Sequence, residues 1–582
     1  MDVRGNVLAF SGEIFGGVAG AASGAENDAA ALLAAFDEVF ARAPDDEGLA
    51  ASALVARLRG PWALAYWHEA SKRLWFGRDV FGRRSLLLRR VFSPGPAGDA
   101  RRDASPRATG LVLSSVAPET LNPETDEWEE LEPGLYCVDA RAAGKENENG
   151  AFVPAPKKKK SGALAERLRR FRRARAATRP AVERASTEDA SARGETEDSD
   201  TEVNDEKKNT ARDAAVDGFV AALAAAVERR VALSVADAPR GNGTSDPPDG
   251  RAFIGVLFSG GVDSMLLAAL AHRYVPPGRA VDLINVCFDG GRSPDRAAAL
   301  DGAAELEALF PTRAWRLVRV DADVDEVRRG LPAARLAGLL RPARTVMDRN
   351  IGAALWLAAR GEGWIDVASA PAANSRPNCS PNSLARRGAA AAAAADGVRI
   401  PYASRARVLL LGQGADEQCA GYSRHRAAFR AGASSGEAIC ALAKEDGPAE
   451  GLSPARDWEA LGDAVRLDAT RLWRRNMGRD DRLVSDRGRE ARFPFLDEGV
   501  AARLLATPLC DVADLSGHEG GDKLLVRAAA RRLGMHRAAA RAKRAIQFGS
   551  RVSKKFDVEA TRGSRRAARG AGASVSSTGS DA

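Results

Sequence analysis

The stretch SGGVDS, residues 259–264, contains the residue types that a phosphate-binding turn requires. It follows the apolar run 254–258 and precedes a second apolar run, so it connects a buried strand to a helix. Glycines let a ligand approach the backbone, and the amides at a helix start attract anions. Helix capping by Ser and Asp is the structural alternative. The complete hexapeptide between strand and helix favours a pyrophosphate site, and no lysine follows it as in GxxxxGK[ST].

Acidic residues after a second strand could bring the magnesium that a bound pyrophosphate needs. In LLLGQGADEQCAGYSRHR, residues 409–426, the pair Asp416 and Glu417 follows Gly412 and Gly414. By itself, an acidic pair at a helix start is explained by the helix dipole. Together with the first loop, the two glycine-rich strand ends and two acidic positions predict a metal–triphosphate site.

Two later stretches carry clustered charge. Residues 472–498 surround Phe493 and Phe495 with charges, and the basic stretch 541–551 contains Lys543. Packed helices with solvated arginines explain most of these residues. Lys543 could instead meet a leaving pyrophosphate as a point charge.

Strands and helices alternate around these loops. Apolar runs, which predict strands, occupy residues 254–258, 282–288, 315–321 and 408–412. Helical periodicity predicts helices over 213–233, 265–274, 295–310 and 345–360. Continuous apolar strands separated by helices indicate an α/β fold with a doubly wound parallel sheet, covered on both faces. In such sheets, ligands bind at the carboxyl ends of the strands.

Composition divides the 582 residues into four segments. Residues 1–137 contain strand-like runs at 6–10, 63–67, 73–77 and 110–115. Residues 138–212 are highly charged with few large apolar side chains, so they predict a disordered linker. The predicted ATP-binding domain spans 213–558, and a disordered tail spans 559–582.

Cysteine usage and charge limit the environment and the partners. The six cysteines contain no CxxC pair, which excludes a zinc or disulfide framework and favours a cytoplasmic location. The start has no signal-peptide pattern, and no apolar run is long enough for a membrane span. Much of the net charge of +8 comes from residues 157–179 and 561–582. These segments are interpreted as solvated charge, with RNA contact or nuclear import as the alternative.

In chain order, SGGVDS, the GQGADE loop ending in GY, EARFPFLD and the basic KR-x₃-F stretch resemble the synthetase half of glutamine-dependent asparagine synthetases. SGGVDS looks like the pyrophosphate-binding loop of the PP-loop ATP pyrophosphatases. Residues 11–17, 26–28 and 60–88 resemble the family's amidotransferase half. The resemblance therefore implies two domains: an α+β class II glutamine amidotransferase-like (Ntn) domain, N-terminally incomplete, and a PP-loop domain.

The resemblance implies ATP-dependent amidation of aspartate through β-aspartyl-AMP, with glutamine or ammonia as the nitrogen source. The implied ATP-binding residues are Phe258, Ser259, Gly260, Gly261, Val262, Asp263, Ser264, Phe288, Asp295, Gly412 and Gln413. The implied Mg²⁺ ligands are Asp263 and Asp416, and the catalytic set comprises Asp263, Asp416, Lys543 and Gln413. The positions that match the glutamine-binding site are Gly12, Glu13 and Asp28.

The chain departs from the family at two places. The family's glutaminase needs a cysteine as residue 1 after methionine removal, within MCG. Here residue 2 is Asp2, no cysteine occurs before Cys137, and the RHRGPD segment is absent. We therefore expect an inactive glutaminase and a truncated start, with a degenerate N-terminal half as the alternative. Gln413 stands where the family has a glutamate, and a neutral amide cannot act as a base. We still expect adenylation of a carboxylate, but the sequence does not identify the acid that is adenylated.

Two other functions are compatible with the sequence. One is a non-catalytic ATP-binding scaffold or regulator, and the other is a PP-loop ligase or thiolase acting on tRNA. The second usually needs a sulfur-handling cysteine, for which the sequence offers no candidate. Partners are therefore expected to be small molecules, without membrane or nucleic acid, and the oligomeric state is open.

Overall fold

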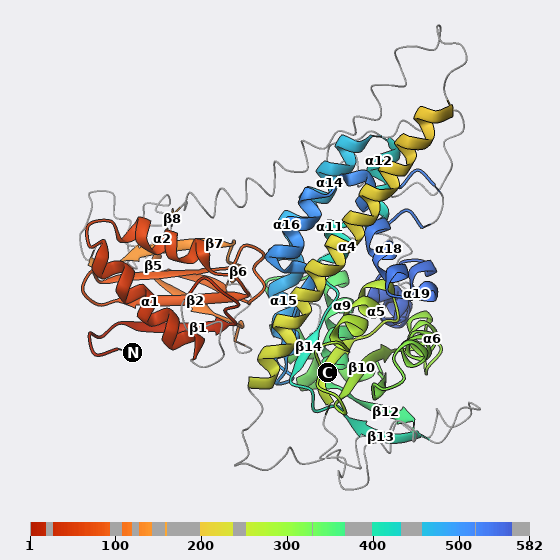
Figure 1. Cartoon of the computed structure of the whole chain (residues 1–582). Coiled ribbons are helices and arrows are strands. Elements are labelled where there is room, and N and C mark those ends of the chain that lie inside the picture. Colours follow the sequence, from red (N-terminus) through yellow and green to blue (C-terminus); the bar gives the residue numbers. More distant parts are fainter. Residues whose placement is uncertain are drawn as a thin grey trace.

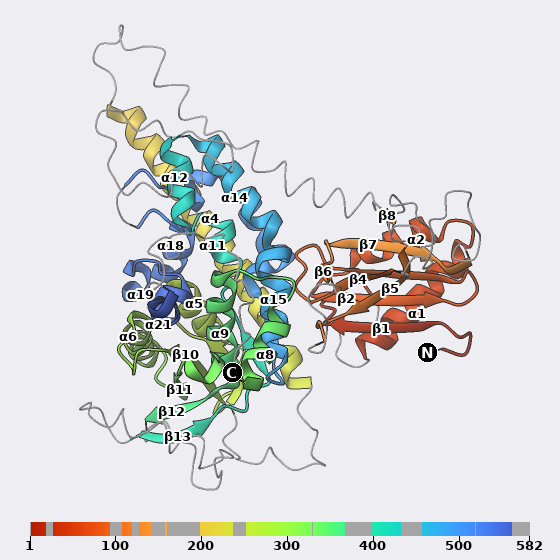
Figure 2. The same ribbon diagram turned by 180° about the vertical axis from the view of Figure 1, so that it is seen from behind.

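The computed structural model describes residues 2–18, 27–92, 108–118, 127–141, 157–159, 198–236, 252–328, 330–366, 399–431, 457–517 and 520–560. A strand-rich N-terminal half lies beside a larger half built from strands and helices (Figure 1). Both views place the N-terminal half against the side of the larger half that carries α15 (Figure 2).

The N-terminal half contains two antiparallel sheets. The larger sheet has the order β1 (Val7–Gly12), β2 (Trp62–His68), β3 (Arg73–Arg78), β7 (Gly134–Asp139), β8 (Lys157–Lys159). The smaller sheet has the order β5 (Ala108–Ser114), β4 (Leu87–Phe92), β6 (Glu129–Glu130). The four strand-like runs predicted here all lie in or overlap strands β1, β2, β3 and β5.

Two helices cover one face of the larger sheet. Side chains of Asn27 and Asp46 cap α1 (Asp28–Arg42) and α2 (Glu47–Arg57). Phe36 of α1 stacks on Tyr66 of β2, with ring centroids 4.6 Å apart, in the core between helices and sheet. Successive residues of a strand face opposite sides of a sheet. In β3, Trp75 therefore lies in this core, and the next residue, Phe76, packs on the other face in a second core together with residues of the smaller sheet.

The larger half is built on a seven-stranded sheet. Its order is β13 (Arg399–Ala403), β12 (Glu362–Asp366), β11 (Trp315–Asp321), β10 (Ala280–Cys287), β9 (Ala252–Leu257), β14 (Val408–Leu410), β15 (Glu490–Arg492). The strands from β11 to β15 in this order pair in parallel, and β12 and β13 are antiparallel additions at one edge. The chain order reverses between β9 and β14, which is the switch point of the sheet.

Helices cover both faces of this sheet. The bounds are α4 (Asp198–Ala236), α5 (Val262–Ala271), α6 (Pro294–Leu309), α8 (Gly330–Leu340), α9 (Val346–Arg360), α11 (Ala415–Gln418), α12 (Ser423–Ala431), α14 (Trp458–Leu472), α15 (Gly478–Ser485), α16 (Glu498–Ala506), α18 (Leu524–Arg532), α19 (His536–Ala540), α20 (Ile546–Gly549) and α21 (Val552–Ala560). Along β10, Leu283 faces the core that contains α4 and α5, and Ile284 faces the core that contains α9 and α15. The predicted parallel sheet, buried on both faces, is therefore confirmed. Within the described residues, no helix combines the length and the apolarity that a membrane span requires.

The helix that follows the predicted linker is longer than the sequence predicts. The helix expected over 213–233 begins at Asp198, inside the range 138–212. Buried Phe219 and Leu223 anchor this helix, and extending a formed helix costs little per residue. The added turns have no apolar stripe, so their charges resemble a linker. Residues 157–159 of the same range form β8. Most of the remaining linker and of the predicted tail lies outside the described residues.

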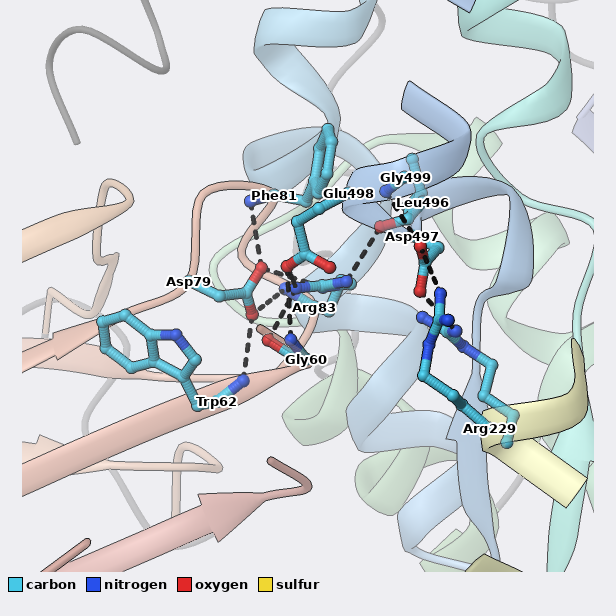
Figure 3. Close-up of polar contacts among 11 residues, drawn as sticks. Gly60, Trp62, Asp79, Phe81, Arg83, Arg229, Leu496, Asp497, Glu498 and Gly499 are labelled. Carbon is cyan, nitrogen blue, oxygen red and sulfur yellow. Dashed lines mark hydrogen bonds and ion pairs between the residues drawn. The ribbon is translucent and has the colours of Figure 1, made fainter. Parts of the chain in front are cut away.

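A buried arginine ties the two halves together (Figure 3). Arg83, of which 1% is exposed, donates to Asp79 of its own half at 2.9 Å. It also donates to Glu498 at 2.6 Å and to the carbonyl oxygen of Leu496 at 2.8 Å, both in the larger half. Burial lowers the pKa of Arg83, but its carboxylate partners outweigh this effect and raise the pKa overall. The guanidinium therefore stays charged inside the interface.

Further ion pairs extend this contact. Arg84 pairs with Asp481 at 3.0 Å and with Glu490 at 2.7 Å. In the opposite direction, Arg482 of the larger half pairs with Glu130 at 3.0 Å. Ions taken out of water must be paired, so these contacts fix the register of the two halves.

Arg83→Met should destabilise the protein by about 3–5 kcal/mol, because Asp79 and Glu498 lose their buried partner. Urea unfolding at pH 7 measures the loss. Arg42→Met is the control: this exposed arginine pairs only at the surface with Glu38, and its removal should cost below about 0.5 kcal/mol. Equal losses in the two variants would contradict the interlock.

Candidate active site

The two glycine-rich loops lie on either side of the switch point. SGGVDS connects β9 to α5, and the GQGADE loop connects β14 to α11. Because β9 and β14 are parallel neighbours, both loops leave the same edge of the sheet. A Cβ placed on Gly412 would lie only 3.1 Å from the Cβ of Asp263, so the loops touch. The first loop is therefore brought against the second as the sequence predicts.

A cavity of about 950 Å³ opens at this edge. The predicted site residues that line it are Phe258, Ser259, Asp263, Ser264, Asp295, Gly412, Gln413, Asp416 and Lys543. The predicted ATP-binding residues that do not line it are Gly260, Gly261, Val262 and Phe288, and the predicted glutamine-site residues lie elsewhere, in the N-terminal half. Most of the site expected from the sequence therefore converges on one cavity.

Gly260 and Phe288 have packing reasons for their identity. Gly260 has φ +73°, and a Cβ there would lie 2.2 Å from the carbonyl oxygen of Ala298 in α6. Glycine is therefore required at this position because α6 lies so close to the backbone, whether or not a ligand also binds there. Phe288 is buried in the core with α9, and its place around the adenosine stays a prediction.

A lysine that the sequence analysis did not select sits between the two predicted metal ligands. Lys523, of which 1% is exposed, precedes α18 and forms ion pairs with Asp263 and, at 2.7 Å, with Asp416. In the sequence, Lys523 follows the glycine pair Gly520-Gly521 directly before a helix, and this pattern was the signal from which it could have been selected as a site residue. Lys543 also reaches Asp416, at 3.4 Å, and its ammonium lies 4.6 Å from the ring centroid of Tyr422.

The pKa values of the two carboxyl groups are shifted in opposite directions. Burial raises the pKa of Asp263, although Lys523 opposes this shift. Burial acts in the same way on Asp416, but Lys523 and Lys543 outweigh it and lower the pKa of that carboxyl group. Burial disfavours the charge of Lys523, yet the two carboxylates raise its pKa overall. Two acids and two lysines thus form one charge-balanced cluster.

The carboxylate pair fits a divalent cation. Asp263 Oδ1 is buried without a hydrogen-bond partner in the described structure, and its other oxygen shares the ammonium of Lys523 with Asp416. Among the described residues, no cluster of three or more His, Cys, Asp or Glu side chains could hold a metal. Mg²⁺ usually takes one or two carboxylates and completes its shell with substrate phosphates and water. Two carboxylates are therefore a suitable protein contribution.

The side chain of Gln413 is hydrogen-bonded to Asp480, a residue that was not predicted as part of the site. Its Nε2 donates to Asp480 Oδ2 at 3.1 Å. Asp480 accepts from Arg479 Nε at 2.8 Å, and Arg479 also pairs with Asp348. Burial raises the pKa of Asp480, and Arg479 opposes that shift. No sequence signal connects Gln413 with a helix residue so far along the chain.

Asp295 lies at the start of α6 on the cavity wall, with 7% of its surface exposed. Burial raises the pKa of its carboxyl group to about 7, and Arg544 only partly opposes this shift. The carboxylate packs against Gly549, where a Cβ would lie 2.1 Å from Asp295 Oδ1. A neutral-pH titration therefore takes place inside the cavity.

The three residues matched to a glutamine site lie together in the N-terminal half. Asp28 accepts from the backbone amide of Ile14 at 2.7 Å, next to Glu13, and Gly12 packs against the carbonyl oxygen of Pro61. Glu13 also faces the larger half, 3.4 Å from Arg492. Burial and the nearby Glu490 raise the pKa of Glu13 to about 7. A glutamine-binding role of this cluster stays a prediction.

Comparison with known proteins gives a consistent result. The asparagine synthase family model matches residues 249–312 and 371–568. Asparagine synthetase domain-containing protein 1 of Bos taurus is 31% identical over 626 aligned residues, which cover 95% of this chain and 86% of the relative. The protein of the same name from Homo sapiens is 30% identical and covers 95% and 85%. Putative asparagine synthetase [glutamine-hydrolyzing] 1 of Methanocaldococcus jannaschii is 32% identical over 103 residues, which cover 18% of this chain and 15% of that protein.

The chain therefore belongs to the asparagine synthase family. Within that family it is similar, over nearly its whole length, to the asparagine synthetase domain-containing proteins of vertebrates. This agrees with the motifs LLGQGADEQCAGYSRHR and GREARFPFLD, which indicate the same branch.

Lys523→Met should lower the free energy of unfolding by about 3 kcal/mol, because two adjacent buried carboxylates lose their cation. Adding Mg²⁺ should then raise the melting temperature of this variant more than that of the unchanged protein. The control Lys555→Met removes a lysine that is 43% exposed and should behave like the unchanged protein. An equal response to Mg²⁺ in all three proteins would show that the carboxylate pair binds no cation.

Asp295→Asn should change how stability depends on pH. The folded-state pKa of about 7 exceeds the ordinary value of 3.8, so the folded chain binds this proton more tightly than the unfolded chain does. Stability from this group is therefore present below pH 4 and lost as the pH rises toward 7. At pH 8 the variant should be more stable by on the order of 1 kcal/mol, and near pH 4 the two should coincide.

Urea unfolding at several pH values measures this difference. Asp45→Asn, at an exposed position after α1, is the control and should show no such pH-dependent gain. A variant with unchanged stability at pH 8 would contradict the raised pKa.

Proposed function

We propose that this protein catalyses ATP-dependent, AMP-forming amidation of a carboxylate, with aspartate as the first candidate acid. One observation carries the proposal: Asp263 and Asp416, from loops on the two sides of the switch point, meet at one cavity together with two lysines. This arrangement suits a nucleotide triphosphate with its magnesium. Membership of the asparagine synthase family agrees with it.

The proposal assigns each half a type of domain. The larger half is a PP-loop ATP pyrophosphatase domain, supported by the position of SGGVDS between β9 and α5. The N-terminal half is a class II glutamine amidotransferase-like (Ntn) domain, supported by its paired sheets and covering helices. The domain limits would be 1–137 and 213–558, with the helix of the second extended back to Asp198.

Adenylation would take place at the carboxylate–lysine cluster. The amides of the SGGVDS loop and the hydroxyl group of Ser259 would bind phosphate oxygens, and Asp263 and Asp416 would hold Mg²⁺. When bound, Mg²⁺ neutralises the triphosphate charge. The acid's carboxylate oxygen bonds to the α-phosphorus as the bond to pyrophosphate breaks. Lys523 and Lys543 place positive charge where pyrophosphate leaves.

Amide formation would complete the reaction. Ammonia attacks the acyl carbon of the acyl-adenylate, and AMP leaves. Gly12, Glu13 and Asp28 are proposed to be the remnant of a glutamine-binding site, and because no cysteine occurs before Cys137, ammonia would be the nitrogen donor. A cytoplasmic location and small-molecule partners remain predictions.

Exchange of radiolabelled pyrophosphate into ATP, dependent on aspartate and Mg²⁺, tests adenylation directly. Asp263→Asn should reduce exchange by at least about 100-fold, because one metal ligand becomes neutral. The control Asp289→Asn removes a carboxylate that pairs with Arg292 outside the cavity lining and should retain exchange. No exchange in the unchanged protein, with MgATP still bound, would instead indicate a non-catalytic ATP-binding protein.

A further inference from the structure

Gln413 occupies a defined place in the cavity. It lies between two glycines in the loop after β14, and Gly412 touches Asp263. Gln413 lines the same cavity as Ser259 and Asp263.

The orientation of that amide is determined by its partner. A carboxylate only accepts hydrogen bonds, so Asp480 must receive the NH₂ group of Gln413, as observed at 3.1 Å. The amide oxygen then lies on the other side of the group, away from Asp480. In this orientation, Gln413 offers an acceptor to whatever occupies the cavity.

Asp480 itself is held from two directions. Only 1% of it is exposed, and Arg479 donates to its Oδ1 at 2.8 Å while also pairing with Asp348. The next residue, Asp481, accepts from the backbone amide of Ser85 at 2.9 Å and pairs with Arg84 in the N-terminal half. A carboxylate so restrained keeps its second oxygen directed at Gln413.

We propose that Asp480 is a positioning residue, which holds the carbonyl oxygen of Gln413 as the hydrogen-bond acceptor for an N–H of the ammonia nucleophile. This inference rests on the proposed amidation. The lone pair of ammonia then faces the acyl carbon. The C–N bond forms, the C–O bond to AMP breaks with its electron pair leaving on AMP, and the nitrogen's proton passes to solvent. Gln413 orients the nucleophile and takes no proton.

The test uses the full chain with aspartate, MgATP and ammonium chloride. Asp480→Asn gives Gln413 a partner that can donate to its oxygen, which removes that oxygen from the cavity. The KM for ammonia should rise about tenfold, the effect of one lost hydrogen bond, with a smaller effect on pyrophosphate exchange. Gln413→Leu should raise the KM for ammonia to a similar extent.

The double variant separates positioning from a merely structural role. Asp480→Asn should add little to Gln413→Leu, because both changes remove the same acceptor. The matched control is Asp486→Asn. This buried acid, at the end of the same helix, accepts from Trp356 at 2.7 Å and does not line the cavity, so the KM for ammonia should stay unchanged.

Two outcomes overturn the inference alone: an unchanged KM for ammonia in Asp480→Asn while exchange persists, or additive effects in the double variant. Absence of pyrophosphate exchange in the unchanged protein is a different result. It overturns the proposed function, and with it this inference.

Discussion

Two partly buried carboxylates side by side require a cation, and the larger half is organised around that requirement. Asp263 and Asp416 come from loops far apart in sequence, which meet because β9 and β14 are parallel neighbours. Lys523 balances both charges. The strand order brings the two loops to one edge, the glycines let them touch, and the charge cluster supplies the carboxylates and lysines on which the proposed binding of a metal-bound polyphosphate depends.

The interface between the halves, away from the cavity, also consists of buried charges that are paired with opposite charges. Arg83 and Arg84 of the N-terminal half are buried against acids of the larger half, and Glu130 receives Arg482 in return. Asp480 and Asp481 connect the two systems, since one faces Gln413 and its neighbour faces Arg84. The position of Gln413 in the cavity wall therefore depends on a helix that also contacts the N-terminal half.

The parallel sheet and most of the cavity residues could be predicted from the sequence, because apolar strands, glycine turns and acidic helix starts are local patterns. Asp480 could not, since it acts through a partner that only the fold brings near, and the glycine pair before Lys523 does not by itself show which carboxylates that lysine meets. The orientation of Phe288 could not be predicted either, because a residue at a strand end can face the cavity or the core, and this one is buried in the core with α9. The start of α4 was missed because its first turns carry no apolar stripe.

The buried contact of Arg83 also has a consequence for how the chain is made. Arg83 and its partner Glu498 are 415 residues apart in sequence. At the usual ribosomal rates, roughly 20 to 80 seconds separate their synthesis. During that interval Arg83 can pair with Asp79 of its own half, but the partners that it takes from the larger half, Glu498 and the carbonyl oxygen of Leu496, do not yet exist. The complete interlock can therefore form only after Glu498 has been synthesised, late in the synthesis of the chain.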